Sequence, residues 1–542
     1  MRALMQSHPL LVSSIISHAA RHHGAAEIVS REPSGALHCT TYAALEHRAR
    51  CLASVLTELG VEPGDRVATL AWNGHRHLEA YYAVPGMGAV IHTVNPRLSV
   101  DDIAFILADA GSTILLAEAG FAPLVAAIAP RLPYLRTVLL LSETPTLPDL
   151  AIPQPLHDYD TLLAAASPIP DWPTLDEASA STLCYTSGTT GRPKGVLYSH
   201  RSQMLHAYAV NLADVFGLRS IDRVLPVVPM FHVNAWGLPH AAPLVGAALI
   251  MPGRHLDGAS LHDLLNRERV TFTAGVPTVW LGLLQYLQTT NARLDTLQRL
   301  VCGGSACPPL LIETFARDYG IRVDHAWGMT ETSPLGTCYS PKNGEDLLPP
   351  ETVAARRLKQ GRAMPGVDMR IVDGDGAELP WDGAIFGNLE VRGHWVTRRY
   401  FGAPADAASP AGWFATGDVA TIDPDGFMQI TDRTKDIVKS GGEWISSIAL
   451  ENIAVEHPDV AEAAIIAVPH PKWDERPLLI VVPKPGRTID RTALLHLYDG
   501  RVARWWTPDE VAIVDELPHT ATGKINKLAL RQTFAGFQLG AS

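Results

Sequence analysis

The sequence predicts an α/β protein: a large N-terminal layered α/β domain with a β subdomain, followed by a small C-terminal α+β domain. Its 542 residues exceed the length that one hydrophobic core usually organises. Between residues 41 and 250, short β-branched runs alternate with longer Ala- and Leu-rich stretches of helical spacing. After residue 360, short strands are separated by Asp-Gly turns. We therefore expect domains at residues 1–434 and 435–542.

The elements of these domains are expected in the following order. Apolar β-branched runs predict strands of a buried, largely parallel sheet at residues 67–72, 137–142, 223–229 and 247–252. Asp-Gly turns predict hairpins at residues 369–380 and 421–433. Beyond a boundary at residues 432–437, helical and strand patterns predict a helix near 447–457 and strands at 460–469 and 477–483.

Composition narrows the class of protein. The net charge of -12 is spread along the chain without a dense basic block, which argues against a nucleic-acid partner. Six cysteines without a C-x-x-C pair favour reduced thiols in the cytoplasm over a structural zinc site. The apolar runs fall short of the roughly 20 residues that span a bilayer, so no integral membrane segment is expected. The apolar run from Leu10 to Ile16 is interpreted as part of a helix.

A loop rich in glycine and hydroxyl residues, from Tyr185 to Gly195, is the strongest local signal. Backbone N–H groups, hydroxyls and a lysine in such a loop can surround a polyphosphate. The alternative is a flexible surface loop, which the flanking apolar segments disfavour. It is not a Walker A loop, because Pro193 stands where that motif needs its second glycine and Gly195 where it needs Ser or Thr. The candidate nucleotide-binding residues are Thr186, Ser187, Gly188, Thr189, Thr190, Gly191 and Lys194.

This loop resembles the phosphate-binding signature of the adenylate-forming superfamily, which comprises acyl-CoA synthetases, luciferases and peptide-synthetase adenylation domains. Four further segments resemble the other signatures of that superfamily, in family order and at plausible spacing. They are Trp327–Thr332, Thr416–Asp418, Asp432–Gly442 and Thr522–Lys524. The resemblance covers nearly the whole chain, and it implies ATP, Mg²⁺ and coenzyme A as the small molecules used, with a C-terminal domain that moves.

The resemblance places the nucleotide and the metal on named residues. Glu331 is a hard oxygen ligand suited to Mg²⁺, with Thr186 as a second metal ligand, and Thr330 can bond the α-phosphate. Taken alone, Glu331 would be read as an exposed carboxylate at the start of a helix. The segment Gly303, Gly304, Ser305 and Ala306 is expected to line the adenine pocket, with Trp327 stacked on the base and Gly328 and Met329 beside it.

Three charged residues complete the adenylation site implied by the resemblance. Asp418 would accept the ribose hydroxyls with Arg433 as its partner, although an Asp after Gly is more often a turn former. Lys524 would supply the positive charge for transfer of the adenylyl group, although a single lysine is usually a solvated surface residue. The hinge is expected at Asp432 and Lys435.

The acyl and thiol sites also follow from the resemblance. His232 is expected where the carboxylate meets the thiol, and Trp236 at a gate of the acyl tunnel, although aromatic residues here equally suit a packed core. Apolar residues 274–280 and Met329 would add to the lining, which favours a hydrophobic acid. The loop Ser440, Gly441, Gly442, Glu443 and Trp444 is expected to shape the coenzyme A channel.

These expectations combine into one function with rivals. The chain is predicted to be an AMP-forming ligase that joins a medium- or long-chain fatty acid to coenzyme A. Alternatives are a ligase for a short-chain or thioether acid such as methylmercaptopropionate, an acyl-AMP ligase or luciferase-like enzyme, and a catalytically dead nucleotide-binding regulator. A homodimer is expected by analogy with the family's long-chain ligases.

Overall fold

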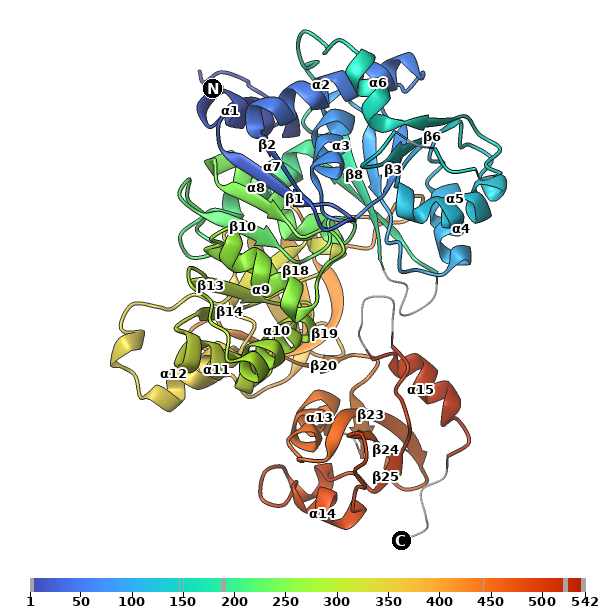
Figure 1. Ribbon diagram of the computed structural model, residues 1–542. Coiled ribbons are helices and arrows are strands. Elements are labelled where there is room, and N and C mark those ends of the chain that lie inside the picture. The colour runs from blue at the N-terminus through green and yellow to red at the C-terminus, as the bar shows by residue number, and fades with distance from the viewer. Residues whose placement is uncertain are drawn as a thin grey trace. The chain divides into compact units, whose positions relative to one another are not determined.

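The computed structural model describes residues 4–145, 147–149, 151–186, 192–441, 443–519 and 525–537, without the side chain of Glu443. Contacts between backbone positions divide the chain into two compact units. The first comprises Met1–Thr186, Pro193–Asp368 and Arg392–Phe414. The second comprises mainly Met369–Val391 and Ala415–Ser542. Figure 1 follows the chain through both units.

A seven-stranded sheet in the first unit is parallel except at its last pair. Helices α4 (Val100–Asp109) and α5 (Ala122–Ile128) pack their apolar side chains against it, in a buried cluster that includes Leu70, Ile106 and Leu115. Ser99 begins α4 by accepting a hydrogen bond from the Asp102 N–H at 3.0 Å. The strand order is β7 (Leu156–Asp158), β6 (Thr137–Leu141), β5 (Ile114–Glu118), β3 (Arg66–Leu70), β4 (Val90–Thr93), β8 (Ala180–Tyr185) and β9 (Gly195–Ser199).

A nine-stranded sheet forms the rest of the first unit. Its six central strands are parallel, and its ends are antiparallel. Strand β1 comes from the N-terminus yet pairs with β11, with Val29 opposite Ile250. The order is β16 (Arg362–Ala363), β15 (Leu335–Cys338), β14 (Arg322–Gly328), β13 (Arg299–Cys302), β12 (Phe272–Gly275), β10 (Arg223–Pro226), β11 (Ala248–Met251), β1 (Glu27–Arg31) and β2 (Leu37–Thr41).

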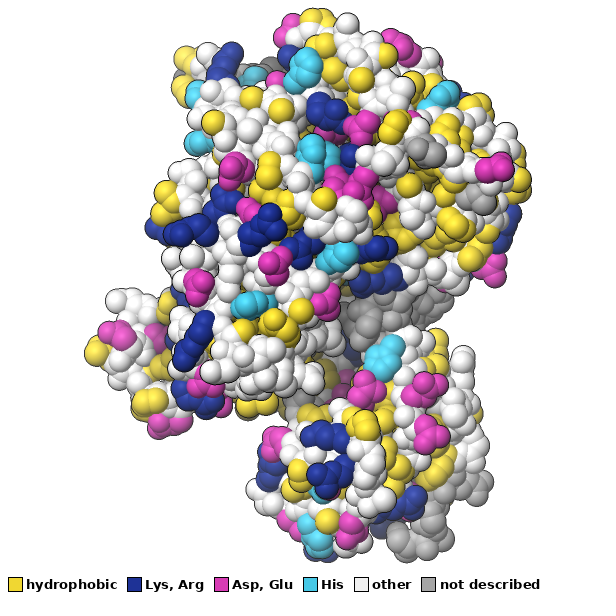
Figure 2. Space-filling view, viewed as in Figure 1, with side chains coloured by type: hydrophobic (Ala, Val, Ile, Leu, Met, Phe, Trp, Pro, Cys, Tyr) yellow, Lys and Arg dark blue, Asp and Glu magenta, His cyan; other side chains and the backbone are white. Residues whose placement is uncertain are grey.

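Helices cover these sheets and bury their apolar faces. Trp280 is fully buried in the cluster that joins β10, β11 and β13 to their helices. The other helices of the first unit are α1 (Val12–His22), α2 (Tyr42–Glu58), α3 (His75–Gly86), α6 (Tyr159–Ala165), α7 (His200–Val210), α8 (Leu238–Val245), α9 (Gly258–Arg267), α10 (Pro277–Thr290), α11 (Pro309–Tyr319) and α12 (Pro350–Leu358). Figure 2 shows acidic and basic side chains interspersed over much of one face.

The described residues of the second unit form two smaller sheets and three α-helices. One sheet has the order β17 (Val367–Val372), β18 (Gly387–Gly393), β19 (Phe414–Ile422) and β20 (Met428–Arg433). The other has the order β22 (Glu443–Ile445), β21 (Val438–Ser440), β24 (Asp474–Pro483) and β23 (Val460–His470), with β25 (Glu510–Ile513) also paired to β24. The helices are α13 (Ser447–Val455), α14 (Arg491–His496) and α15 (Lys527–Thr533).

The structure confirms the α/β class and most expected elements. All four expected strands of the first unit are present as β3, β6, β10 and β11. The hairpin at 421–433 is present as β19 and β20, whose ends Ile422 and Met428 face each other. The hairpin expected at 369–380 is present in a short form, because Val372 and Glu378 form an antiparallel bridge and the Leu379 N–H donates to the Ile371 carbonyl at 2.9 Å. Strand β17 also pairs with β18. The domain boundary at residue 434 stays a prediction about which part of the chain moves.

Candidate active site

The predicted phosphate loop connects two antiparallel strands, β8 and β9. Tyr185 faces Gly195 in this pair. At its base the Thr186 N–H donates to the Lys194 carbonyl at 2.9 Å, and the Lys194 N–H donates to Thr186 Oγ1 at 3.2 Å. These bonds hold the two ends of the loop together and keep Thr186 beside Lys194. The expected contacts of Ser187, Gly188, Thr189, Thr190 and Gly191 lie outside the described residues.

Tyr400 links the phosphate loop to the predicted metal ligand. Its hydroxyl donates a 2.7 Å hydrogen bond to Glu331 Oε1, and the Lys194 ammonium lies 4.8 Å from the centre of its ring. Burial, reinforced by the Glu331 carboxylate, raises the pKa of Tyr400, so the phenol stays protonated and donates. Sequence reasoning missed Tyr400. It follows two arginines in a segment with no recognisable local motif, and only tertiary contacts reveal its place.

Glu331 and Thr330 are positioned by a short buried turn, η4 (Thr330–Thr332), that follows β14. The Tyr198 hydroxyl donates to the Thr330 carbonyl at 2.6 Å, and the Thr397 N–H donates to the Glu331 carbonyl at 2.7 Å. Both residues are 7% exposed. The turn therefore has little freedom, and the Glu331 carboxylate is held next to Tyr400 rather than extended into solvent.

The expected adenine-binding segments meet at one edge of the nine-stranded sheet. Strands β13 and β14 are parallel neighbours, so the segments that follow them leave the sheet side by side, at the edge where α/β proteins usually bind ligands. Residues Gly304, Ser305 and Ala306 are exposed there. Trp327 is buried, and a Cβ atom at Gly336 would lie 2.5 Å from its ring, so one face of the indole packs on backbone. Gly328 and Met329 follow it, both partly buried.

Trp236 lies at the end of a left-handed turn, η3 (Val233–Gly237). Its residues Val233 to Trp236 have φ between 42° and 57°, a conformation that costs non-glycine residues roughly 1–2 kcal/mol each. The turn is anchored by buried Asn234, whose Oδ1 accepts a 3.1 Å hydrogen bond from the Tyr81 hydroxyl. A Cβ atom at Gly303 would lie 2.9 Å from the indole ring of Trp236. The expected gate residue thus packs directly on the expected adenine-binding segment.

Other expected acyl-site residues differ in their surroundings. His232 is half-buried immediately before the left-handed turn, and its N–H donates to the Pro229 carbonyl at 3.0 Å. Trp280, expected as part of the lining, is fully buried in the core of the nine-stranded sheet. Its indole fills the space above Gly275, where a Cβ atom would lie 2.6 Å from the ring. Trp280 therefore stabilises the wall behind the site.

In the second unit, Asp418 and Arg433 form the expected pair. They face each other across β19 and β20, and Arg433 Nε lies 2.7 Å from Asp418 Oδ1. Asp418 is 2% exposed, whereas the Arg433 side chain is 43% exposed. Gly417 adopts a φ of 75°, which leaves the backbone beside Asp418 in the left-handed region that glycine favours. The carboxylate is therefore fixed at its position by the arginine.

The expected hinge and coenzyme A segments are also in the second unit. Asp432 is buried, and burial raises the pKa of its carboxyl. Burial lowers the pKa of Lys435. Ser440 faces Glu443 across the tight turn between β21 and β22. Gly441 has a φ of 61° in that turn, and Trp444 lies on β22 opposite Lys439. Gly442 and Lys524 lie outside the described residues.

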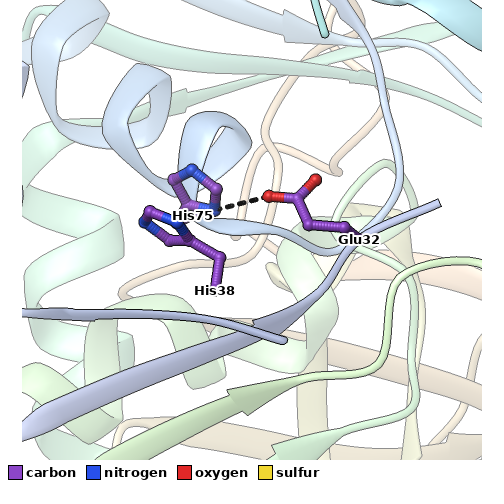
Figure 3. A group of neighbouring side chains, drawn as sticks. All are labelled: Glu32, His38 and His75. Carbon is purple, nitrogen blue, oxygen red and sulfur yellow. Dashed lines mark ion pairs between the residues drawn. The ribbon is translucent and has the colours of Figure 1, made fainter. Parts of the chain in front are cut away.

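A second polar cluster, which belongs to none of these motifs, lies in the first unit. Glu32, His38 and His75 offer ligand atoms that all lie within 4.8 Å of one another (Figure 3). The two imidazoles are stacked, with ring centres 4.0 Å apart and planes 18° apart, so their nitrogen lone pairs lie in nearly parallel planes. Arg76 binds both oxygens of Glu32, at 3.0 and 3.1 Å. This geometry suits a packed ion-pair network better than a shared metal ion.

In the part of the chain that the structure describes, no helix has the length and apolar character needed to cross a bilayer.

Comparisons with known proteins agree with these motifs. The AMP-binding enzyme model matches residues 16–401, and the model of the AMP-binding enzyme C-terminal domain matches residues 449–524. The 3-methylmercaptopropionyl-CoA ligase of Ruegeria lacuscaerulensis is 50% identical over 530 residues, covering 98% of each chain. The medium-chain-fatty-acid–CoA ligase of Ectopseudomonas oleovorans is 47% identical over 539 residues, covering 99% of this chain and 98% of that protein.

A solved structure extends the likeness to the fold. The crystal structure of ATP-bound MatB from Rhodopseudomonas palustris matches with a TM-score of 0.81 at 27% identity, covering 96% of this chain and 99% of that one. The first family model alone covers more than half of the chain, and the relatives match nearly all of it. The chain therefore belongs to the AMP-binding enzyme family, the adenylate-forming enzymes.

Proposed function

We propose that the protein is an ATP-dependent acyl-CoA ligase that activates a medium- or long-chain fatty acid as an acyl-adenylate and transfers the acyl group to coenzyme A. The observation that carries the proposal is the arrangement of Lys194, Tyr400 and Glu331. The Lys194 ammonium lies over the ring of Tyr400, and the Glu331 carboxylate accepts a hydrogen bond from its hydroxyl. Both charges are thus held at the base of a loop whose composition suits a polyphosphate.

The proposed chemistry proceeds in two transfers. A carboxylate oxygen of the acid attacks the α-phosphorus of ATP, and the bond to pyrophosphate breaks. Because negative charge builds on the phosphoryl oxygens, catalysis depends mainly on positioning and on placed positive charge. Lys194 and Lys524 supply that charge. The thiolate of coenzyme A then attacks the acyl carbon, and AMP leaves.

The donor set near the loop fits Mg²⁺. Glu331 presents a carboxylate whose one oxygen is held by Tyr400, and Thr186 adds a hydroxyl, both hard oxygen donors of the type that Mg²⁺ prefers. Bound there, Mg²⁺ would neutralise phosphate charge. In the second unit, Asp418, fixed by Arg433, would accept hydrogen bonds from the ribose hydroxyls.

The identity of the acid rests on the acyl site and on the relatives. Trp236 and the buried turn around it favour an apolar substrate, and one relative is a medium-chain-fatty-acid–CoA ligase. A second candidate is methylmercaptopropionate, because the 3-methylmercaptopropionyl-CoA ligase is similar at 50% identity.

We further propose a cytoplasmic location, in keeping with free cysteines throughout the described residues, and a homodimer by analogy with long-chain ligases.

A pyrophosphate-release assay across straight-chain acids from acetate upward, methylmercaptopropionate and an aryl acid tests the substrate class. Maximal kcat/KM with medium or long acids supports the first candidate, and maximal kcat/KM with methylmercaptopropionate supports the second. Adenylate that persists when coenzyme A is added would identify an acyl-AMP ligase. If none of the acids causes pyrophosphate release, the protein would instead be a nucleotide-binding regulator.

Lys524→Ala tests the assignment of the lysine. Removing one placed charge should lower the rate of adenylate formation by about 100- to 1000-fold. Thioester formation from supplied acyl-adenylate should be largely spared, because the α-phosphate transfer is already complete. Equal loss of both half-reactions in a stably folded variant would show that Lys524 does not act on the first transfer.

A further inference from the structure

We propose that Lys527 is a positioning residue, which ties the start of helix α15 to the hinge carboxylate of Asp432 through Ser447. The proposal rests on the proposed function, because it assigns Lys527 a role in adenylate formation. Lys527 belongs to none of the motifs identified in the sequence. It is the first residue of α15 and is three residues beyond Lys524.

The link consists of two successive contacts inside the second unit. Lys527 Nζ donates to Ser447 Oγ at 2.6 Å. Ser447 Oγ donates to Asp432 Oδ1 at 3.0 Å, and the Ser447 N–H donates to Asp432 Oδ2. Ser447 is the first residue of α13, so the hinge carboxylate also caps that helix, where a negative charge is favourable. One serine thus joins the hinge to the starts of two helices.

Glu451 balances the charge of the lysine. Its Oε1 lies 2.6 Å from Lys527 Nζ and accepts a 2.7 Å hydrogen bond from the Ile465 N–H on β23. Burial alone would lower the pKa of Lys527, but the carboxylates of Glu451 and Asp432 outweigh it, so its pKa is raised and the ammonium persists. The Lys527 side chain is only 12% exposed. Removing the cation would leave two buried carboxylates without their main counter-charge.

The described chain on either side of residues 520–524 is also fixed. His519 and Ile525 form a β-bridge, and the Asn526 N–H donates to the Pro518 carbonyl at 2.7 Å. Asn526 caps α15 by accepting from the Ala529 N–H at 3.1 Å. Lys527 therefore anchors the C-terminal end of the segment that contains Lys524, and it anchors that end to the hinge.

A second ion pair repeats the connection. Arg531 Nη1 lies 2.6 Å from Asp436 Oδ1. Arg531 is one helical turn beyond Lys527 on α15, and Asp436 is four residues beyond Asp432. Arg531 thus binds one carboxylate of the hinge segment directly, and Lys527 reaches another, Asp432, through Ser447. An ordinary packing role for α15 would need neither pair, because Leu530 already buries its apolar face against Ile466 and Ile480.

The test compares Lys527→Met with Lys527→Arg and with Leu530→Ala. Methionine keeps the unbranched stem and removes the charge, whereas arginine keeps the charge. Leu530→Ala is the matched control, because it loosens the same helix without touching the hinge contacts. Rapid-quench measurements give the rate of acyl-adenylate formation, and a second assay measures thioester formation from supplied acyl-adenylate and coenzyme A. Thermal melts establish the folded fraction of each variant.

Lys527→Met should slow adenylate formation by about 100-fold, the effect expected when a catalytic group is misplaced by about 1 Å. Thioester formation should change less than about threefold, and Lys527→Arg should recover most of the first rate. Leu530→Ala should keep the wild-type rate per folded molecule. Equal rates in Lys527→Met and Leu530→Ala, corrected for folded fraction, would overturn the proposal.

A second variant covers the case in which Lys527→Met does not fold. Ser447→Ala removes the bridging hydroxyl but keeps the backbone N–H bond to Asp432, and it should slow adenylate formation by about tenfold with thioester formation spared. An unchanged rate would overturn the link. A wild-type protein that releases no pyrophosphate with any acid would instead contradict the proposed function, so the two failures are distinguishable.

Discussion

Tyr400 donates its hydroxyl hydrogen to Glu331 while its ring lies beneath the ammonium of Lys194. The tyrosine therefore fixes the separation between a cation and a carboxylate that come from segments more than 100 residues apart. Both charges would act on the same polyphosphate. Their spacing, rather than either charge alone, is the property that Tyr400 controls.

Tyr400→Phe should lower the rate of adenylate formation by about 10- to 100-fold. It removes one hydrogen bond to a charged group, typically worth about 1.5–3 kcal/mol, but keeps the ring under Lys194. Pyrophosphate release measured over a range of Mg²⁺ concentrations should show a higher Mg²⁺ requirement. Tyr339→Phe is the control, because Tyr339 also donates to a glutamate, Glu345, outside the candidate site. Similar losses in both variants would argue for a general loss of stability.

Trp236→Ala should allow medium- and long-chain acids to bind without nucleotide and should broaden chain-length preference. The indole is 5% exposed and packs on Gly303, so we expect nucleotide bound at the adenine-binding segment to displace it and open the space that an acid needs. Calorimetry with a non-hydrolysable ATP analogue measures the order of binding. If Trp236 is ordinary core, the variant should instead lose about 3–5 kcal/mol of stability while acid binding keeps its dependence on ATP.

Lys435→Pro should retain pyrophosphate release and lose thioester formation. Proline fixes φ near -65° and restricts the residue before it, which would oppose rotation at the proposed hinge. Measuring both half-reactions on the same preparation gives the answer. Equal thioester yield in the variant and the wild type would contradict a hinge that turns between the two reactions.

Acidification should destabilise the protein between pH about 6.5 and about 4. Burial lowers the pKa of His77, His240 and His325 to about 4 and of His92 and His206 to about 3. Below pH 6.5 the unfolded chain binds protons that the folded protein does not, so this stability is present above pH 6.5 and is lost as the pH falls. Each such histidine contributes a slope of about 1.4 kcal/mol per pH unit.

His240→Phe tests this slope at one position. The ring packs near Tyr81 and Tyr82, so phenylalanine keeps an aromatic side chain without a titrating nitrogen. Denaturant unfolding at pH 7.5, 6.5 and 5.5 should give a shallower decline than in the wild type, by about 1.4 kcal/mol per pH unit. Parallel declines would show that His240 is protonated equally in both states.

The parts of the fold that could be predicted are those encoded by local pattern. Apolar β-branched runs identified β3, β6, β10 and β11 because parallel strands are buried on both faces. The Asp-Gly turn after β17 indicates a hairpin, and Val372 and Glu378 do form an antiparallel bridge across it. A turn signal does not specify the longer pairing, which β17 makes with β18.

Residues that act through tertiary contacts are not marked by any local sequence pattern of this kind. Tyr400, Tyr198 and Lys527 reach their partners across more than 60 residues of chain. The left-handed turn at Val233 to Trp236 opposes local preference, because a β-branched valine and a tryptophan rarely adopt positive φ. Strain of this kind is maintained only by surrounding packing, here by Asn234 and Tyr81, and gathers at functional sites.

The pairing of β1 with β11 has a consequence for biosynthesis. Strand β2 is made directly after β1, but the ribosome must add roughly 200 residues after Arg31 before β11, the parallel partner of β1, exists, which takes on the order of 10–40 s at cellular rates. During that interval the newly made β1 segment has an unsatisfied edge and exposed apolar side chains, a state that invites aggregation. Expression yield should therefore depend on chaperones that bind nascent chains, and slowing translation should lengthen the period of risk.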